Sequence, residues 1–445
     1  MHWLPSLFAA EAIPSAMITF VALLMFVQLG VGWEQSTLLC GLLTLPWVLK
    51  SFVRARLRQM EHYALQLKVY EAIIWCLLVG LAFCFTDRPA TRWLVFACLF
   101  ILCLFCASHE LVARMYYERK LRPRWQRYYN SWKMFISQST VVLTYGVMIV
   151  AVGFLEVFYH TRRTAIPLSW SMAVYTLAGL YLLLVVYNFF VLREPSFTDR
   201  REHRFRNPQS PHGFALIETV KAEVRIIDRI AHKRHWLAVI IALAVLLLPQ
   251  ALMFHARVLF FIGSRAQGGL GVSLQWIGLA QGTVGVIAFS AGLAIGHLLL
   301  SRQHRHPTRL LASMAFLLCL SPVVYLLLAT SAEGSGMISF LSMQFSLFAD
   351  LLPLCVAAFI AQFCFGYGLN CTMPFIHFIS GERYRSTINY LYIPLISLVM
   401  LLPMAASGWL VTRLGFPTFF LLDSLLALPA WLAAYLGWHL ISTSQ

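Results

Sequence analysis

Long apolar runs alternate with short polar segments along almost the whole chain. Many of these runs reach about 18 residues without a charge, which is the length needed to cross a hydrocarbon core about 30 Å thick. Six runs precede one long polar interval between Arg193 and Trp236, and six follow it. The pattern predicts an all-α membrane protein with twelve transmembrane helices, arranged as two six-helix halves.

The polar interval sets the domain boundaries. The first half covers 1–192, the linker 193–236 and the second half 237–445. The predicted spans of the first half lie at about 12–31, 35–53, 72–85, 93–113, 134–158 and 168–192. Those of the second half lie at about 237–254, 274–300, 310–329, 351–378, 388–411 and 416–438.

The second part of the linker has a helical pattern. Apolar residues recur every three or four positions, at Ile217, Val220, Val224, Ile227 and Ala231, and basic residues lie between them. This spacing predicts an amphipathic helix. Two interpretations stay open: a helix lying on the membrane surface, or a solvated helix packed on neighbouring loops.

Composition excludes a set of soluble domains. Hydrophobic residues make up 60% of the chain and charged residues 12%, against about 45–50% and about 25% in soluble domains. The net charge of +16 comes mainly from short loops on one side of the predicted spans. Because basic loops stay in the cytoplasm, both termini are expected there. No nucleic-acid-binding pattern accompanies the charge, so membrane lipids, and not nucleic acids, are expected to contact the chain.

A short internal echo indicates duplication. LGVGWEQSTLLCGL, from Leu29, is similar in outline to LGVSLQWIGLAQGT, from Leu270. Each copy lies at the junction of the first and second spans of its own half. Parallel repeats of this kind are typical of secondary transporters, whose substrate site lies between the halves near the bilayer midplane.

Several segments, in order, also resemble one transporter family. They are EAIPSAMITFVALLMFVQLGV, LLTLPWVLKSF, GGLGVSLQWIGLAQGTVGVIAFSAGLAIGHLLLSR, QFCFGYGLNCTMPFIHFISGERYRSTINY and LPMAASGWLVTRLGFPTFF. The chain resembles the major facilitator superfamily, in the branch of AmpG-type muropeptide permeases and related acetyl-CoA transporters. The resemblance implies alternating access and import of a muropeptide or sugar-like solute across a bacterial inner membrane.

The departures from that family bear on coupling. The basic run Arg54, Arg56 and Arg58 occupies the place where relatives usually carry an acid, and Ala361 stands where they often carry Glu. In the seventh span LPQALMFHAR replaces the expected acid–base pairs. Proton coupling and turnover are therefore less strongly implied than the fold.

Few ionisable side chains fall inside the predicted spans. Glu11 and Glu71 are expected at span ends, reaching the membrane surface. His109 and Glu110, adjacent in the fourth span, are the best candidates for proton coupling, although adjacent positions point to different faces; the alternative is a helix-end role near Arg114. His297 is a further candidate, with an interhelical hydrogen bond as the alternative.

Neutral polar residues at mid-depth are the candidates for substrate binding. Amides hydrogen-bond sugar hydroxyls or peptide groups without burying a charge, and they also join helices to one another. Tyr367 adds a ring with a polar tip. The candidates are Gln28, Asn188, Gln250, Gln281, Gln362, Tyr367 and Asn370.

No catalytic, cofactor or metal-binding motif accompanies these residues, so the chain is not expected to be an enzyme. The sequence favours a secondary transporter of a small polar solute, with protons as the candidate coupling ion. Two alternatives stay open: a transport-dead receptor or partner subunit that keeps the fold, and a membrane protein that handles lipids or acyl compounds.

Overall fold

A computed structural model describes residues 3–50, 62–85, 91–121, 133–193, 236–302, 307–333, 351–374 and 385–443, together with 221, 225 and 228. Within these residues the chain is helical apart from short connections, and it contains no strand. Of the predicted linker helix, only Lys221, Arg225 and Asp228 are described; each is helical and exposed. The rest of that prediction lies outside the described residues.

The first half contains six consecutive helical spans, and π-helical turns interrupt the first and fifth. They are built from α1 (Trp3–Ala16), η1 (Met17–Val21) and α2 (Ala22–Gln28); α3 (Trp33–Leu43); α5 (Tyr63–Cys84); α6 (Thr91–Lys120); the span 133–158 with η2 (Val142–Val147) and α8 (Met148–Phe158); and α9 (Ala165–Val191).

The second half repeats this plan. Its spans are built from α11 (Trp236–Ile262); α12 (Leu274–Ile277), η5 (Gly278–Gly285) and α13 (Val286–Arg302); α14 (Pro307–Glu333); α16 (Leu351–Leu369); α18 (Arg385–Leu414); and α19 (Phe416–Thr443). A short 3-10 turn, η4 (Arg265–Gln267), lies in the connection after α11.

Every predicted span corresponds to a helix. Ten helices among the described residues are long and apolar enough to cross a membrane, and α3 and α19 occupy the two remaining predicted spans. Large apolar side chains such as Leu402 and Phe158 are exposed, as expected for a surface that contacts lipid. Several boundaries were wrong: α1 begins at Trp3 rather than 12 and α5 at Tyr63 rather than 72, while α6 continues to Lys120 rather than 113 and α11 to Ile262 rather than Phe254.

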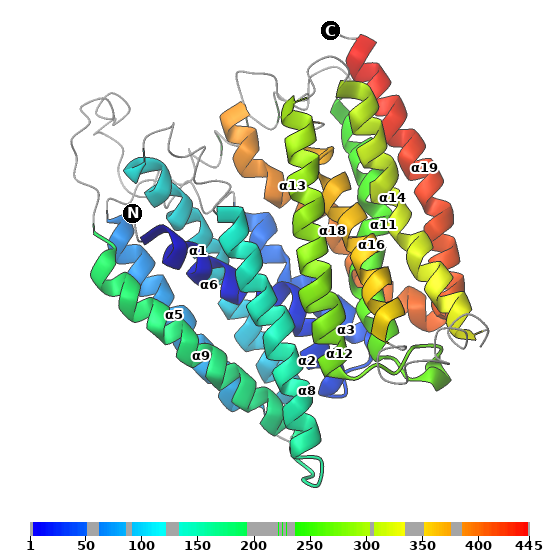
Figure 1. The fold of residues 1–445 in the computed structure, drawn as a ribbon. Coiled ribbons are helices and arrows are strands. Elements are labelled where there is room, and N and C mark those ends of the chain that lie inside the picture. Colours follow the sequence, from blue (N-terminus) through cyan, green and yellow to red (C-terminus); the bar gives the residue numbers. More distant parts are fainter. Residues whose placement is uncertain are drawn as a thin grey trace, which may run out of the picture.

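The two halves form separate bundles that meet at one end (Figure 1). The bundles spread apart toward the end where both termini lie, and they come together at the opposite end. There α3 packs on α18, α8 on α12, and η2 on η5. We call this contact region the closed end.

Small residues permit this close approach. A Cβ atom on Gly282 would lie 2.5 Å from the carbonyl oxygen of Tyr145, and one on Gly41 would lie 2.7 Å from Cβ of Ala405. Beside Gly41, the Thr37 hydroxyl donates to the Ala405 carbonyl at 3.0 Å. Glycine at such contacts lets backbones pack directly, as is common between membrane helices.

The internal echo has a structural counterpart. Gly30 and Gly271 occupy the same place in the two copies, and both adopt a left-handed backbone, with φ of 76° and 63°. Only glycine adopts this conformation without strain. In both copies the chain then turns into the next helix after an extended residue, Gly32 or Ser273. The matched turns support two halves built on one plan.

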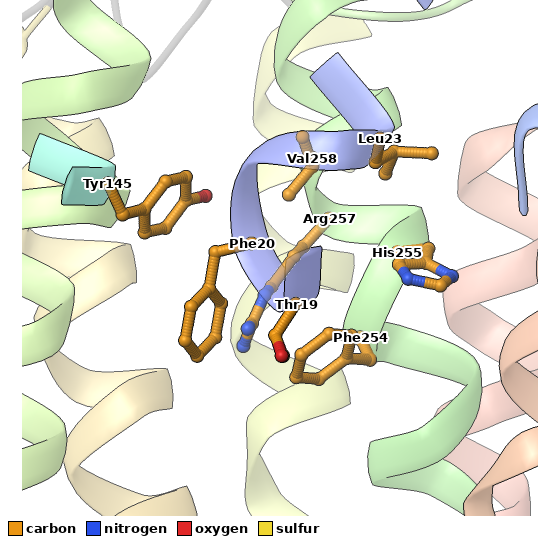
Figure 2. A pocket seen from close by; sticks show the side chains of 8 residues that line it. All are labelled: Thr19, Phe20, Leu23, Tyr145, Phe254, His255, Arg257 and Val258. Carbon is orange, nitrogen blue, oxygen red and sulfur yellow. The ribbon is translucent and has the colours of Figure 1, made fainter. Parts of the chain in front are cut away.

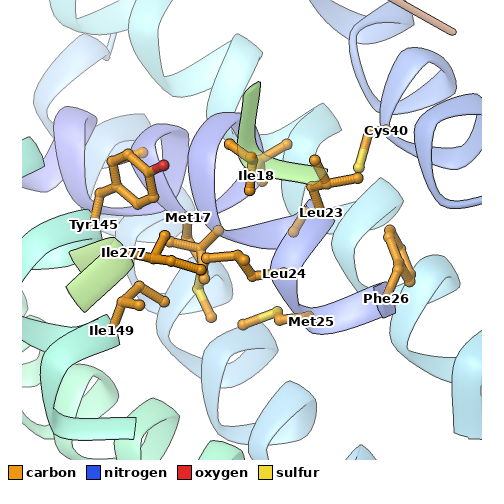
Figure 3. Packing of buried hydrophobic residues seen from close by; sticks show 14 of the residues in the cluster. Met17, Ile18, Leu23, Leu24, Met25, Phe26, Cys40, Tyr145, Ile149 and Ile277 are labelled. Carbon is orange, nitrogen blue, oxygen red and sulfur yellow. The ribbon is translucent and has the colours of Figure 1, made fainter. Parts of the chain in front are cut away.

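A continuous apolar core joins the halves at the closed end (Figure 3). Met17, Leu24 and Met25 of the first span lie near Ile149 of the fifth, and Ile277 of the second half enters the same cluster. The first span is therefore central to the molecule, with most of its side chains buried.

Substitution of Gly282 by Leu should push the closed end apart, because no side chain fits against the Tyr145 carbonyl. Spin labels are placed at the exposed positions Gln35 on α3 and Arg413 on α18, and the distance between them is measured by electron paramagnetic resonance. The distribution of this distance should become longer and broader in the variant. Gly80→Leu is the control, since nothing lies within 4 Å of a Cβ at Gly80. An unchanged distribution in Gly282→Leu would contradict the packing described.

Candidate functional site

A narrow cavity lies between the halves, at mid-height of the central spans (Figure 2). The first half contributes Thr19, Phe20, Leu23 and Tyr145, and the second half Phe254, His255, Arg257 and Val258. Both halves thus supply side chains to one space, as expected for a site that changes when the halves move relative to one another.

π-Helical turns place several of these residues. Thr19 and Phe20 lie in η1 and Tyr145 in η2, while η5 carries Gln281. A π-helical turn widens the helix locally and is frequent at functional sites. The three turns lie on helices that face the opposite half, and η2 packs directly on η5.

Arg257 is the charged residue of this cavity. Its side chain is 7% exposed, and its guanidinium carbon lies 5.1 Å from the ring centre of Phe254. With its oxygen turned toward Arg257, the Gln362 amide accepts hydrogen bonds from both terminal guanidinium nitrogens, at 3.1 Å from Nη2. The opposite orientation would set the amide NH₂ against the cation, donor facing donor.

A chain of neutral polar groups continues from Gln362. The Gln362 amide oxygen that faces Arg257 lies 3.4 Å from Oε1 of Gln281, so in this orientation the two amides are neighbours without a hydrogen bond. Gln281 Nε2 donates to the Tyr325 hydroxyl at 2.8 Å. All three side chains are buried. We call Arg257, Gln362, Gln281 and Tyr325 the arginine cluster. Two of the predicted substrate-binding residues, Gln281 and Gln362, are thus brought together.

Aromatic rings cover the cluster on the side of the first half. Phe20 stacks on Tyr145, with ring centres 5.3 Å apart and planes inclined by 18°. Phe20 also contacts Phe254 across the boundary between the halves, at 5.9 Å. Figure 2 shows the Arg257 side chain directed toward the part of the cavity lined by Phe20 and Thr19.

A second set of charges lies within the first half. Lys50 Nζ donates to Glu110 Oε1 at 2.8 Å, and the Trp47 indole donates to the other oxygen at 3.2 Å. Lys133 contacts Glu11 at 2.9 Å and interacts electrostatically with Glu110. Four helices thus contribute four alternating charges. Glu11, predicted to reach the membrane surface, pairs with Lys133, which is the first residue of its span and is 34% exposed.

His109 points to a different partner, as its position next to Glu110 requires. Its Nε2 lies 3.3 Å from Oε1 of Glu71, which also accepts from Asn188 Nδ2 at 2.9 Å. The Ser6 hydroxyl donates to the side-chain oxygen Oδ1 of Asn188 at 2.6 Å. Glu71 is fully buried, so its predicted place at the membrane surface was wrong. The structure places Asn188 here and not at the cavity between the halves. His109 and Glu110 contact Glu71 and Lys50 respectively, and Arg114 pairs with Glu118 at 3.1 Å.

The other predicted residues lie outside the arginine cluster. Gln250 hydrogen-bonds Ser321 and the Leu318 carbonyl, and Asn370 donates to the Leu293 carbonyl at 3.3 Å, so both join helices of the second half. Gln28 lies at the end of α2. Tyr367 packs on Phe363, and His297 is exposed on α13. Among the described residues no three His, Cys, Asp or Glu side chains gather as metal ligands.

Sequence reasoning missed Arg257, Lys50 and Lys133. The predicted seventh span ends at Phe254, so Arg257 falls just beyond its predicted end. Lys50 and Lys133 stand close to predicted span ends, where a lysine is usually explained by reaching to the surface. An available signal was the run of apolar residues from Val258 to Ile262, which continues the helix beyond the charge.

Several solved transporters have a similar fold. A bacterial homologue of the human lysosomal transporter Spinster, in an inward-facing, occupied conformation, has a TM-score of 0.67 and 12% identity, covering 98% of this chain and 96% of its own. The inward-open xylose transporter XylE from E. coli has 0.57 and 11%, covering 96% and 94%. A structure concerned with proton-dependent oligopeptide transporters has 0.63 and 10%, covering 99% and 97%.

At such identity the likeness defines the fold alone. The chain is an integral membrane protein with the fold of the major facilitator superfamily, which confirms the predicted fold class. No family model matches the sequence, and no curated protein matches it either.

The ion pair of Lys50 and Glu110 should stabilise the first half measurably. Breaking a buried pair by removing one partner costs about 3–5 kcal/mol, and the lower end applies because the Glu110 side chain is 19% exposed. Lys50→Gln and Glu110→Gln should each lower the unfolding temperature in detergent, and the double variant should lose less than the sum. Arg92→Gln, at an exposed position on the same helix α6, is the control. Additive losses would contradict the pairing.

Proposed function

We propose that this protein is a secondary transporter that moves a polar solute across the membrane by alternating access. The observation that carries the proposal is the cavity lined by Arg257 of the arginine cluster, which lies between two halves that meet at the closed end. If the closed end opened and the end with the termini closed, the same side chains would face the other side of the membrane. The chemistry of the site suits binding and has no constellation for bond cleavage.

The finer proposal is a muropeptide or sugar-like solute, carried across a bacterial inner membrane with both termini in the cytoplasm. The resemblance of the sequence to muropeptide permeases supports it, as do the amides of Gln281 and Gln362 beside aromatic rings. Amides hydrogen-bond hydroxyl and peptide groups, and ring faces pack on the apolar faces of sugars.

We place proton coupling in the first half, at Glu110 and His109. The carboxylate of Glu110 is held by Lys50, and that of Glu71 by His109 and Asn188. Protonation of either acid would weaken a contact between helices, and so would change the relative free energy of the two conformations. His297, exposed and without a described contact, remains a weaker candidate.

The alternatives are less well supported. The transport-dead receptor drew on few charges within the spans, whereas Glu11, Lys50, Glu110 and Lys133 form ion pairs there. The basic run at 54–58, on which it also drew, lies outside the described residues. A protein that handles lipids or acyl compounds would use the same cation for an anionic head group, so the resemblance to muropeptide permeases is what favours a polar solute over it.

The direct experiment is uptake of labelled anhydro-muropeptide into proteoliposomes, with and without an imposed inward proton gradient. We expect accumulation that the gradient stimulates. Gln362→Ala should reduce flux at least about tenfold, because hydrogen bonds in the bound state are lost, and His109→Gln should remove the stimulation by the gradient.

Thr330→Ala, which changes an exposed hydroxyl on α14, is the matched control and should keep full uptake. Absence of flux with folded, correctly oriented protein would eliminate this solute and favour the receptor. Full uptake in both Gln362→Ala and His109→Gln would overturn the assignment of these residues.

A further inference from the structure

Arg257 differs from the buried and half-buried lysines of the first half in lacking an acidic partner. In the first half Lys50 is paired with Glu110 and Lys133 with Glu11. No carboxylate pairs with Arg257 among the residues that the structure describes. Its neighbours there are an amide, an aromatic ring and two tyrosine hydroxyls, those of Tyr145 and Tyr325, which are close enough to interact with its charge.

A cation in this place is costly to the protein alone. An ionised side chain within a membrane span loses hydration and is usually compensated by an opposite charge or a water-filled space. Neutral dipoles such as the Gln362 oxygen compensate only part of that loss. The Nε–H of Arg257 also has no acceptor among the described residues. The site therefore holds an unbalanced positive charge and an unused donor.

The guanidinium is directed into the cavity between the halves. It lines that space with Thr19 and Phe20 of the first half. None of the cavity-lining side chains labelled in Figure 2 is acidic. A guanidinium presents five donors in one plane, a geometry that matches the two oxygens of a carboxylate or phosphate. The Gln362 amide oxygen occupies the edge with the two terminal nitrogens, and the Nε–H keeps no acceptor among the described residues.

We propose that Arg257 binds an anionic group, a carboxylate or a phosphate, of the transported solute. The solute supplies the negative charge that the protein lacks at this position. Gln362 orients the guanidinium, and the rings of Phe20, Tyr145 and Phe254 enclose the site. The proposal rests on the transport function above and narrows its substrate class to anionic polar solutes.

The test uses thermal unfolding of the full-length protein in detergent, with probes in matched pairs at constant ionic strength. N-acetylmuramic acid, a carboxylate, is compared with neutral N-acetylglucosamine, and glucose 6-phosphate with glucose. We expect an anionic member to raise the unfolding temperature and its neutral partner to leave it unchanged. Which pair responds distinguishes carboxylate from phosphate. The proposal is overturned if neither anion stabilises the protein more than its neutral partner.

Variants of Arg257 separate a binding role from a structural one. Arg257→Gln should weaken anion binding about tenfold or more, because a charged hydrogen-bonding group is removed, while Arg257→Lys should retain part of it. Without ligand, Arg257→Gln should unfold at a higher temperature than the native protein, since an uncompensated buried charge is lost. Arg162→Gln, at an exposed arginine that lies over Tyr159, is the control and should behave as the native protein.

A structural arginine would give the opposite result: a lower unfolding temperature for Arg257→Gln and no selective effect of anions on the native protein. Transport is scored separately in proteoliposomes. Anion-selective stabilisation that needs Arg257, without any uptake, supports the anion site and contradicts the transport proposal. Equal uptake of a neutral solute by the native protein and Arg257→Gln supports transport and overturns the anion site.

Discussion

The cost of placing charge in a hydrocarbon environment constrains this structure more than any other term. Every ionised group inside a span must find an opposite charge, a set of dipoles or a water-filled space. The first half meets this constraint internally, since Lys50 and Lys133 face Glu110 and Glu11. The second half does not, because Arg257 meets neutral groups only. The two halves share a plan of helices but differ in how their charges are balanced.

This difference implies different roles for the two halves. Charge within the first half is tied to contacts between its own helices, so a change of protonation there would alter the packing of one bundle. The uncompensated charge of the second half lies beside the other bundle, where a ligand can reach it. The closed end, held by glycines at Gly41 and Gly282, keeps the two bundles together while the opposite end is apart (Figure 1). The proposed binding cavity and the closed end, which would have to open, thus lie next to each other along the same central spans.

The fold could be predicted from the sequence because membrane spans depend on hydrophobic length, a local property of the chain. The duplication was also visible, and Gly30 and Gly271 show why the echo persists at that place: both turns need a left-handed residue. The candidate site was only partly predictable. The sequence predicts Gln281, Gln362, Asn188 and Gln250 alike as amides at mid-depth, but only Gln281 and Gln362 lie beside Arg257, whereas Asn188 contacts Glu71 and Gln250 contacts Ser321. Partner choice depends on helix rotation, which the local pattern does not contain. Arg257 was missed because one helix end was placed too early, and the π-helical turns that position Thr19 and Tyr145 have no sequence signature.

The central claim is that one cavity becomes accessible from each side of the membrane in turn. The most direct measurement is the reaction of Thr19→Cys with a membrane-impermeant maleimide in oriented vesicles, followed by mass spectrometry of the peptide that contains position 19. Thr19 is exposed and lines the cavity, whereas Met17→Cys, at a fully buried position, should not react. The account predicts reaction from the side of the termini in this variant, and from the opposite side once Gly282→Leu opens the closed end. Reaction from the same side in both variants, or from neither side, would contradict it.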